Sequence, residues 1–217
     1  MNRSLRRTLF WILVAAYVAG SVWWLLHVPH QPRNLLRAVP GPATIVSLHD
    51  NLAGRWDAIA AHPAALSIAG ALGMSAEDWA ALQQDPGFRY ILNLIGRREL
   101  LAAYVPFIAY QHQPAWVLAS WLGGESHRLR WSLAFTKIPG LQRAGEIGDW
   151  PVWVYRWQTE NGSGSITFAI VEGMVLGCTS PNLAAMETVI ETYNGIYPSI
   201  RNRRDLVDLN GKLFAPG

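Results

Sequence analysis

Three runs in the second half of the chain decide the fold: WPVWVYRWQ at 150–158, SITFAIV at 165–171 and MVLGCT at 174–179. Each is rich in the β-branched and aromatic residues that favour strands. Asn161-Gly162 is a hairpin-turn signal between the first two runs, and Glu172-Gly173 makes a second tight turn before the third. The spacing therefore predicts an antiparallel meander.

A helix is expected directly after the meander. Ser180-Pro181 supplies a side-chain cap and a proline whose missing N–H costs nothing at a helix start. Apolar residues then recur at helical spacing as far as about Tyr193, and Gly195 ends the pattern. The prediction is one helix from Pro181 to about Tyr193.

The segment before the meander mixes strand and helix signals. Strands are predicted at 43–48, 99–106 and 115–122, and helices at 51–61, 64–72, from Ser75 onward and at 88–95. Ser75 with Asp78 three residues later makes a partial capping box, whereas 127–135 fits either a strand or a helix. Strands and helices are partly segregated, so the fold class is α+β, with a mainly antiparallel sheet and helices packed on one face.

The N-terminal run from Thr8 to Val28 has no charged residue. Its 21 residues are long enough for a helix to cross a bilayer core. Trp11 near one end and Trp23 and Trp24 near the other match the preference of tryptophan for membrane interfaces. We predict an uncleaved transmembrane signal anchor. A cleaved signal peptide is the alternative, although no small-residue cleavage motif follows the run.

Basic residues flanking this run predict its orientation. Arg3, Arg6 and Arg7 precede it, and Arg33 and Arg37 follow further away. The positive-inside rule places the N-terminus in the cytoplasm and the body outside the plasma membrane. The expected divisions are a tail and anchor at 1–28, a linker at 29–42, an α+β extracytoplasmic domain at 43–195 and a polar tail at 196–217, which could begin a second half.

Composition limits the function. The chain is 51% hydrophobic and 15% charged, which excludes a disordered, solvating protein. Removing Arg3, Arg6 and Arg7 from the 18 basic residues leaves 15, equal to the 15 acidic residues. The body is therefore neutral, which argues against a nucleic-acid partner.

No constellation typical of catalysis, cofactor binding or metal binding stands out. The six histidines are scattered without metal-ligand spacing. His49-Asp50 follows a strand, but Asp50 fits better as a cap of the next helix. Ser126 and His127 lack the sequence context of a nucleophile elbow. Cys178 is the only cysteine and lies in an apolar run, as a buried structural thiol would.

Tryptophan is the unusual feature, with eleven residues. On a strand at 150–158, Trp153, Tyr155 and Trp157 share one face, because residues two apart point the same way. This aromatic row is either core beneath the helices or an exposed platform for a partner, a glycan or a lipid.

Two segments resemble a loosely defined family of bacterial membrane-anchored envelope proteins of unknown function. Ala43-Thr44-Ile45-Val46-Ser47-Leu48 matches the family's opening strand, and the segment from Ile170 to Pro181 looks like its strand, turn, strand and capped helix. The resemblance implies a signal anchor followed by a periplasmic domain. It brings no catalytic residues.

The expectation is a non-catalytic, single-pass membrane protein whose body is an interaction or scaffold domain of the cell envelope. Its partners would be the bilayer, through residues 8–28, and other envelope or membrane proteins. The alternative is a module that binds a lipid or another apolar ligand. A third alternative is a hydrolase that uses His49 or His127.

Overall fold

The computed structural model describes residues 3–27, 29, 31–71, 75–108, 114–135, 140–159 and 162–203. Its centre is a seven-stranded sheet in which every neighbouring pair is antiparallel, in the order β1-β2-β3-β7-β6-β5-β4. The strands are β1 (Ile45–Asp50), β2 (Glu99–Val105), β3 (Ala115–Trp121), β4 (Leu141–Ile147), β5 (Trp150–Thr159), β6 (Gly162–Val171) and β7 (Met174–Cys178). The α+β class is confirmed.

The predicted meander is the β5-β6-β7 part of this sheet. Glu172 and Gly173 both have positive φ angles, 42° and 85°, and close the β6–β7 turn. The predicted strands at 43–48, 99–106 and 115–122 correspond to β1, β2 and β3. Pairing of β3 with β7 joins the group β1-β2-β3 to the group β4–β7, so distant parts of the sequence form one sheet.

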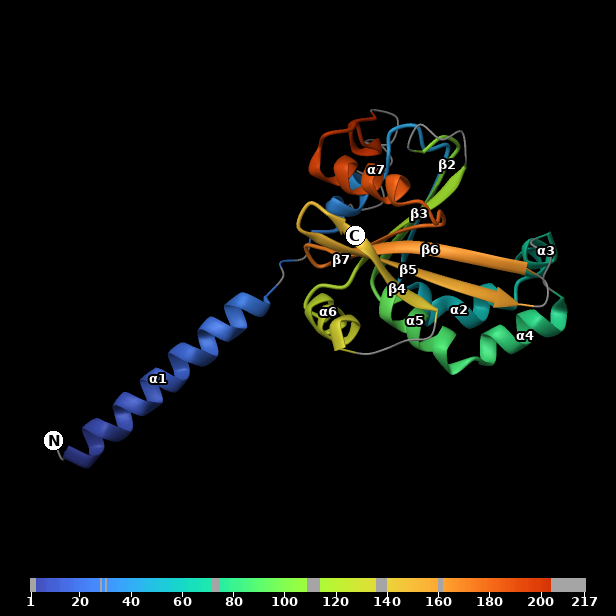
Figure 1. Ribbon diagram of the computed structural model, residues 1–217. Helices are drawn as coiled ribbons and strands as arrows, with labels where there is room; N and C mark the ends of the chain where they lie inside the picture. Colours follow the sequence, from blue (N-terminus) through green and yellow to red (C-terminus); the bar gives the residue numbers. More distant parts are fainter. Residues whose placement is uncertain are drawn as a thin grey trace.

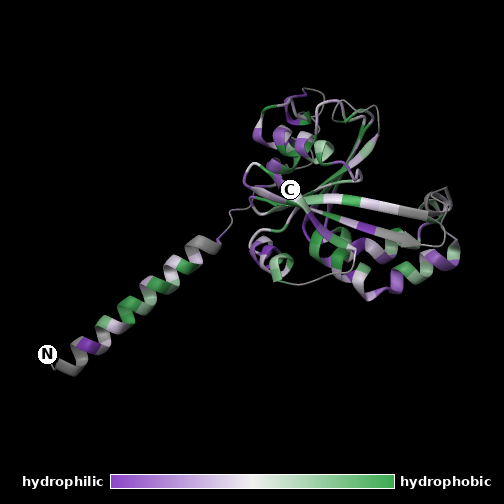
Figure 2. Ribbon diagram, in the orientation of Figure 1, coloured by the Kyte–Doolittle hydropathy of each residue, from purple (hydrophilic) through white to green (hydrophobic). Residues whose placement is uncertain are grey.

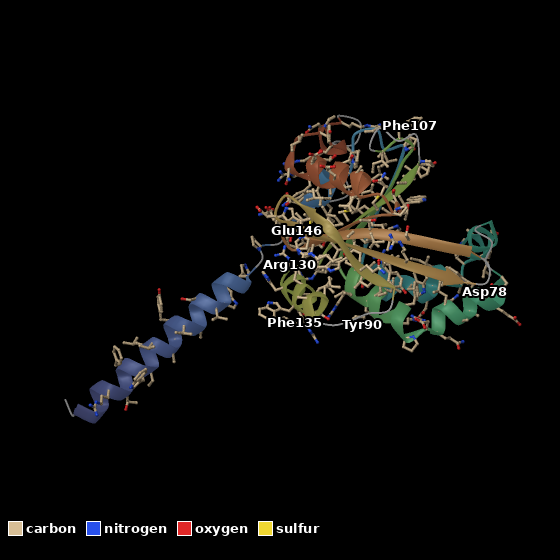
Figure 3. All side chains as sticks on the ribbon, viewed as in Figure 1. Asp78, Tyr90, Phe107, Arg130, Phe135 and Glu146 are labelled. Carbon is tan, nitrogen blue, oxygen red and sulfur yellow. The ribbon has the colours of Figure 1, made fainter. Side chains whose placement is uncertain are left out.

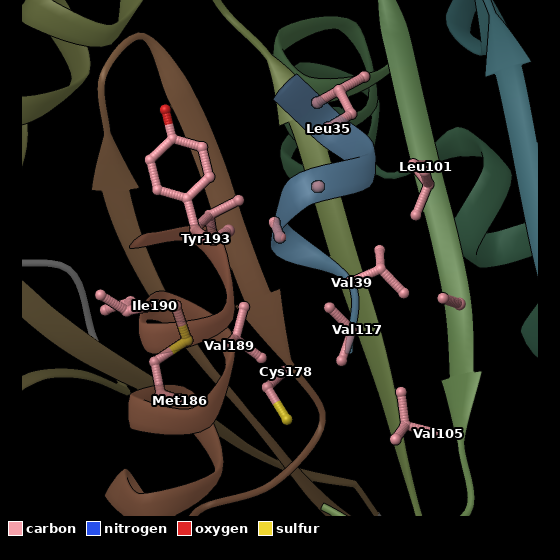
Figure 4. Packing of buried hydrophobic residues seen from close by; sticks show 14 of the residues in the cluster. Leu35, Val39, Leu101, Val105, Val117, Cys178, Met186, Val189, Ile190 and Tyr193 are labelled. Carbon is pink, nitrogen blue, oxygen red and sulfur yellow. The ribbon is translucent and has the colours of Figure 1, made fainter. Parts of the chain in front are cut away.

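One face of the sheet is covered by α7 (Leu183–Asn194) and by the 3₁₀ helix η1 (Pro32–Ala38). Met186, Val189, Ile190 and Tyr193 of α7 pack with η1 and with strand residues such as Val117, as Figure 4 shows. Helix α7 begins later than predicted, because Asn182 rather than Ser180 is its N-cap.

The opposite face is covered by helices from the β1–β2 connection. These are α2 (Leu52–Ala60), α3 (Pro63–Ala71), α4 (Ala76–Gln84) and α5 (Pro86–Gly96). In Figure 1, α2, α4 and α5 lie below the strands. Helix α5 contacts β2 and β3, and the Ser120 hydroxyl on β3 donates to the Ile95 carbonyl oxygen. The prediction of helices on one face is therefore wrong, because this sheet carries apolar residues on both faces.

Residues 29–42, predicted as a linker, contribute to the core. Leu35, Ala38 and Val39 are fully buried in the main apolar cluster. Pro40 forms an isolated bridge with Ser199 after α7, and the Ile200 amide donates to the Val39 carbonyl oxygen at 3.0 Å. The body therefore begins at η1, and it extends beyond residue 195 to the short 3₁₀ helix η2 (Ile200–Asn202).

The remaining body elements are α6 (Glu125–Phe135) and β4. The segment that fitted either a strand or a helix is α6. Strand β4 was not predicted, because its sequence, LQRAGEI, has little strand character. It pairs with β5 at the sheet edge through a register shift between Arg143 and Gly145.

The N-terminal run forms α1 (Arg3–Leu26), which projects away from the body in Figure 1. The predicted helix is confirmed as far as Leu26. Within the part of the chain that the structure describes, no helix is both long and apolar enough to cross a membrane. The predicted span also includes Val28 and the side chains of Leu9, Trp24, Leu25 and Leu26, which lie outside the described residues.

Candidate functional site

A cavity of about 280 Å³ opens where the chain leaves α1 and enters the body. It lies at the end of the sheet that includes the last residue of β3, the first of β5 and the β6–β7 turn. Six of its lining residues are His27, Trp121, His127, Arg130, Trp150 and Glu172. The segment that follows α1, the sheet and α6 therefore all contribute to one site.

Arg130 is the cationic group of the cavity. One guanidinium nitrogen, Nη2, donates to the Ile170 carbonyl oxygen at 2.9 Å, and the guanidinium carbon lies 5.0 Å from the centre of the Trp150 ring. Burial lowers the pKa of Arg130 because it removes the charge from water. Figure 3 labels Arg130 on the side of the body from which α1 departs. No carboxylate among the described residues forms an ion pair with it.

His127 lies one helical turn before Arg130 on the same helix. Its Nε2 atom is buried and has no hydrogen-bond partner within the described residues. An imidazole nitrogen can donate or accept according to its tautomer. A ligand in this cavity could therefore satisfy His127 with a polar atom of either kind.

Glu172 is the anionic group. Its Oε2 accepts a hydrogen bond from the Tyr193 hydroxyl at 2.5 Å, and the Arg37 guanidinium carbon lies 5.0 Å above the Tyr193 ring. Burial, followed by the hydrogen bond and charge of Glu172, raises the pKa of Tyr193, so the phenol stays a donor. The second carboxylate oxygen, Oε1, takes no part in this hydrogen bond and can accept one from a ligand.

The predicted aromatic row lies on the face opposite the α7 core. Trp153 stacks on Phe168 with ring centres 5.9 Å apart and is only 8% exposed, so it offers little surface to a partner. Tyr155 is 36% exposed. The side chain of Trp157 lies outside the described residues.

A second aromatic group extends this face toward β1. Val117, Cys178, Thr167 and Val154 form one register row across the central strands. Val117 and Cys178 belong to the core beneath α7. Trp116 and Tyr155, each next to a residue of this row, therefore both point to the face opposite α7. Trp116 is 41% exposed and contacts Tyr104 edge-on, with ring centres 5.5 Å apart, and Tyr104 faces the exposed Ile45.

The residues considered for hydrolysis have local structural contacts. His49 Nε2 lies 2.6 Å from the Ser47 hydroxyl. Asp50 does not cap α2; Asn51 does so, accepting from the Gly54 amide. Ser126 is buried, and its hydroxyl donates to the Gly123 carbonyl oxygen at 2.6 Å.

Other sequence-derived candidates are also placed. Among the described residues, no three His, Cys, Asp or Glu side chains gather closely enough to hold a metal ion. Cys178 is a buried free thiol, as predicted, and burial raises its pKa to about 12. Trp11 and Trp23 are exposed on α1, and the Trp23 ring stacks on His27 at the cavity rim with ring centres 4.9 Å apart.

Comparisons with protein-family models, with curated proteins and with solved structures find no match to this chain.

Sequence patterns did not reveal the cavity. Arg130 belongs to a segment that fitted either a strand or a helix, so the sequence did not define which way its side chain points. The one available signal was Glu172. Two successive residues with positive φ form the kind of turn that prefers Asn-Gly or Gly-Gly, and a glutamate in the first position is unusual there.

Proposed function

We propose that the protein is a non-catalytic, membrane-tethered interaction domain of the cell envelope, with α1 in the bilayer. The carrying observation is the surface of α1. Phe10, Trp11, Ile12 and Leu13 are consecutive, so they point in four directions around the helix, and each is between 58% and 68% exposed. Figure 2 shows hydrophobic residues along its central part. A helix that is apolar all round is normally buried in protein or in lipid.

Tryptophan positions and flanking charges support the bilayer over a protein environment. Trp11 and Trp23 stand toward the two ends of the helix, where the membrane interfaces would lie. Arg3, Arg6 and Arg7 precede the apolar run. On the positive-inside rule, the N-terminus is cytoplasmic and the body lies outside the plasma membrane.

Interaction with other envelope proteins is the second part of the proposal. It is supported by the exposed group formed by Ile45, Trp116 and Tyr155. Tryptophan and tyrosine are enriched among the residues that carry binding energy at protein interfaces. Trp153 lies on the same face beside Tyr155, but it is buried and would pack within the body rather than contact a partner.

Membrane extraction tests the tether. The full-length chain should stay in the membrane pellet after alkaline carbonate washing. The double variant Leu13→Lys/Val18→Lys should be released, because each central lysine costs about 2.5–3.5 kcal/mol on insertion. Ile91→Lys is the control, since Ile91 is an exposed apolar residue of the body. A wild-type chain that washes off like the double variant would refute the tether.

Orientation and partner binding need separate measurements. A reporter fused after Gly217 should be active outside the cytoplasm, and activity inside would overturn the orientation.

A photo-crosslinking residue at Trp116 should give adducts with membrane or envelope proteins, whereas one at Trp131, on α6, should not. Equal adduct patterns from the two positions would contradict an interface at the Trp116 surface.

Binding of a lipid or another amphiphilic ligand is a second candidate function. The observation that favours it is the cavity between Trp121 and Trp150, which combines aromatic walls with charged groups. Mass spectrometry of the protein purified from membranes would show a co-purified ligand, and the Arg130→Gln variant should lose it.

A further inference from the structure

We propose that the cavity at the end of α1 binds a zwitterionic phosphodiester headgroup that carries a primary ammonium, the chemistry of a phosphoethanolamine lipid. The assignment to a lipid rests on the proposed membrane tether; the assignment of the headgroup rests on the cavity alone. Arg130 and His127 would bind the phosphodiester, and Glu172 would bind the ammonium.

The cationic side has unused donors. Arg130 carries five N–H donors, and one nitrogen is engaged with the Ile170 carbonyl oxygen. Its contact with the Trp150 ring, 5.0 Å from the guanidinium carbon to the ring centre, does not neutralise the charge. A planar guanidinium matches two phosphate oxygens. The buried His127 Nε2 can donate to a further oxygen.

The anionic side is held in place by its own contacts. Tyr193 fixes one carboxylate oxygen of Glu172. The backbone of Glu172 is left-handed, with φ of 42°, a conformation that Asn or Gly adopts more readily. A primary ammonium has three N–H donors, one of which can reach the remaining carboxylate oxygen. A quaternary ammonium has none.

The two charges line one cavity but do not pair with each other. None of the ion pairs found among the described residues joins Arg130 to Glu172. A purely anionic ligand would satisfy Arg130 and meet the repulsion of Glu172. A ligand with both charges satisfies both sides, and about 280 Å³ suits a small headgroup. His27 and Pro29 on the rim place the cavity beside the end of the tether.

Binding can be measured with the full-length protein in detergent. Calorimetric titration with glycerophosphoethanolamine should give binding at least tenfold tighter than with glycerophosphocholine or inorganic phosphate. Arg130→Gln and Glu172→Gln should each weaken it at least tenfold. Arg128→Gln is the matched control, because Arg128 is an exposed arginine two residues away that pairs with Glu125 at 3.9 Å.

Several results would overturn the proposal. Equal affinity for inorganic phosphate would reduce the cavity to an anion site, and equal affinity for glycerophosphocholine would remove the role of Glu172. Absence of binding would refute it outright. Thermal unfolding of each variant checks folding, and if Arg130→Gln does not fold, Glu172→Gln alone decides.

A second arm identifies the source of the headgroup. Full-length protein in nanodiscs containing phosphatidylethanolamine should no longer bind the soluble compound, because lipid occupies the cavity; in phosphatidylcholine nanodiscs it should still bind. Equal binding in both nanodiscs would assign the cavity to a soluble compound and overturn the lipid assignment. If α1 does not anchor the protein in the membrane, the carbonate wash will release the wild-type chain. The titration in detergent does not depend on that anchor and would be unaffected.

Discussion

Replacing Trp153 with alanine is expected to destabilise the body by about 3–5 kcal/mol, the usual range for a buried Trp→Ala change. A tryptophan buries roughly 150–250 Å², and at about 25 cal/mol per Å² this corresponds to about 4–6 kcal/mol. That figure is an upper bound, because an unfolded chain already covers part of its apolar surface. Trp153 is nearly fully buried and stacked on Phe168, so little of the loss can be recovered from solvent.

The measurement is urea unfolding followed by circular dichroism. Trp131→Ala is the matched control: the same residue is removed, but Trp131 is 68% exposed and stacks on an exposed Phe135. It should change stability by no more than about 0.5 kcal/mol. If Trp153→Ala unfolds at the same urea concentration as the wild type, the sheet face opposite α7 is not packed around Trp153 and Phe168 as described.

Two further predictions concern a turn and the pH dependence of stability. Gly148→Ala should lower the free energy of unfolding by about 1–2 kcal/mol through left-handed backbone strain alone, because the space around Gly148 is open. Gly140→Ala should lower it further, because a Cβ there would also meet the Arg156 carbonyl oxygen at 2.5 Å. Equal unfolding midpoints for the two variants would refute this. Burial raises the pKa of the Cys178 thiol from 9.0 to about 12 and also raises that of Tyr193. The unfolded chain therefore loses these protons first, so stability should fall as the pH rises from about 9 to 12. Cys178→Ala should reduce that slope in urea titrations at several pH values, and an unchanged slope would contradict the assignment to Cys178.

Local signals predicted most elements of the fold. The capping box of Ser75 with Asp78 is present as predicted at the start of α4. Alternating β-branched and aromatic residues, separated by two short turns, were sufficient to define β5, β6 and β7. These features depend on neighbouring residues, so they can be recognised without knowing what packs against them.

Features that depend on long-range packing were not predicted. Three prolines and two arginines near residues 30–42 suggested a linker, but Leu35 and Val39 are buried because α7, about 150 residues later, covers them. Strand β4 has weak strand propensity and exists through its pairing with β5. The cavity unites Arg130, Trp150 and Glu172 from three separate elements, and no sequence spacing encodes that meeting.

The two ends of the sheet are suited to different roles if α1 lies in the bilayer. Five residues, 27–31, separate α1 from η1, and even fully extended they reach only about 18 Å. Because η1 is fixed in the core by Leu35 and Val39, the cavity end would stay close to the surface of a bilayer that holds α1. Trp116 and Tyr155 lie toward the other ends of β3 and β5, away from Trp121 and Trp150 at the cavity. The short tether thus holds the charged cavity where a headgroup could enter it and leaves the exposed aromatic surface available to proteins.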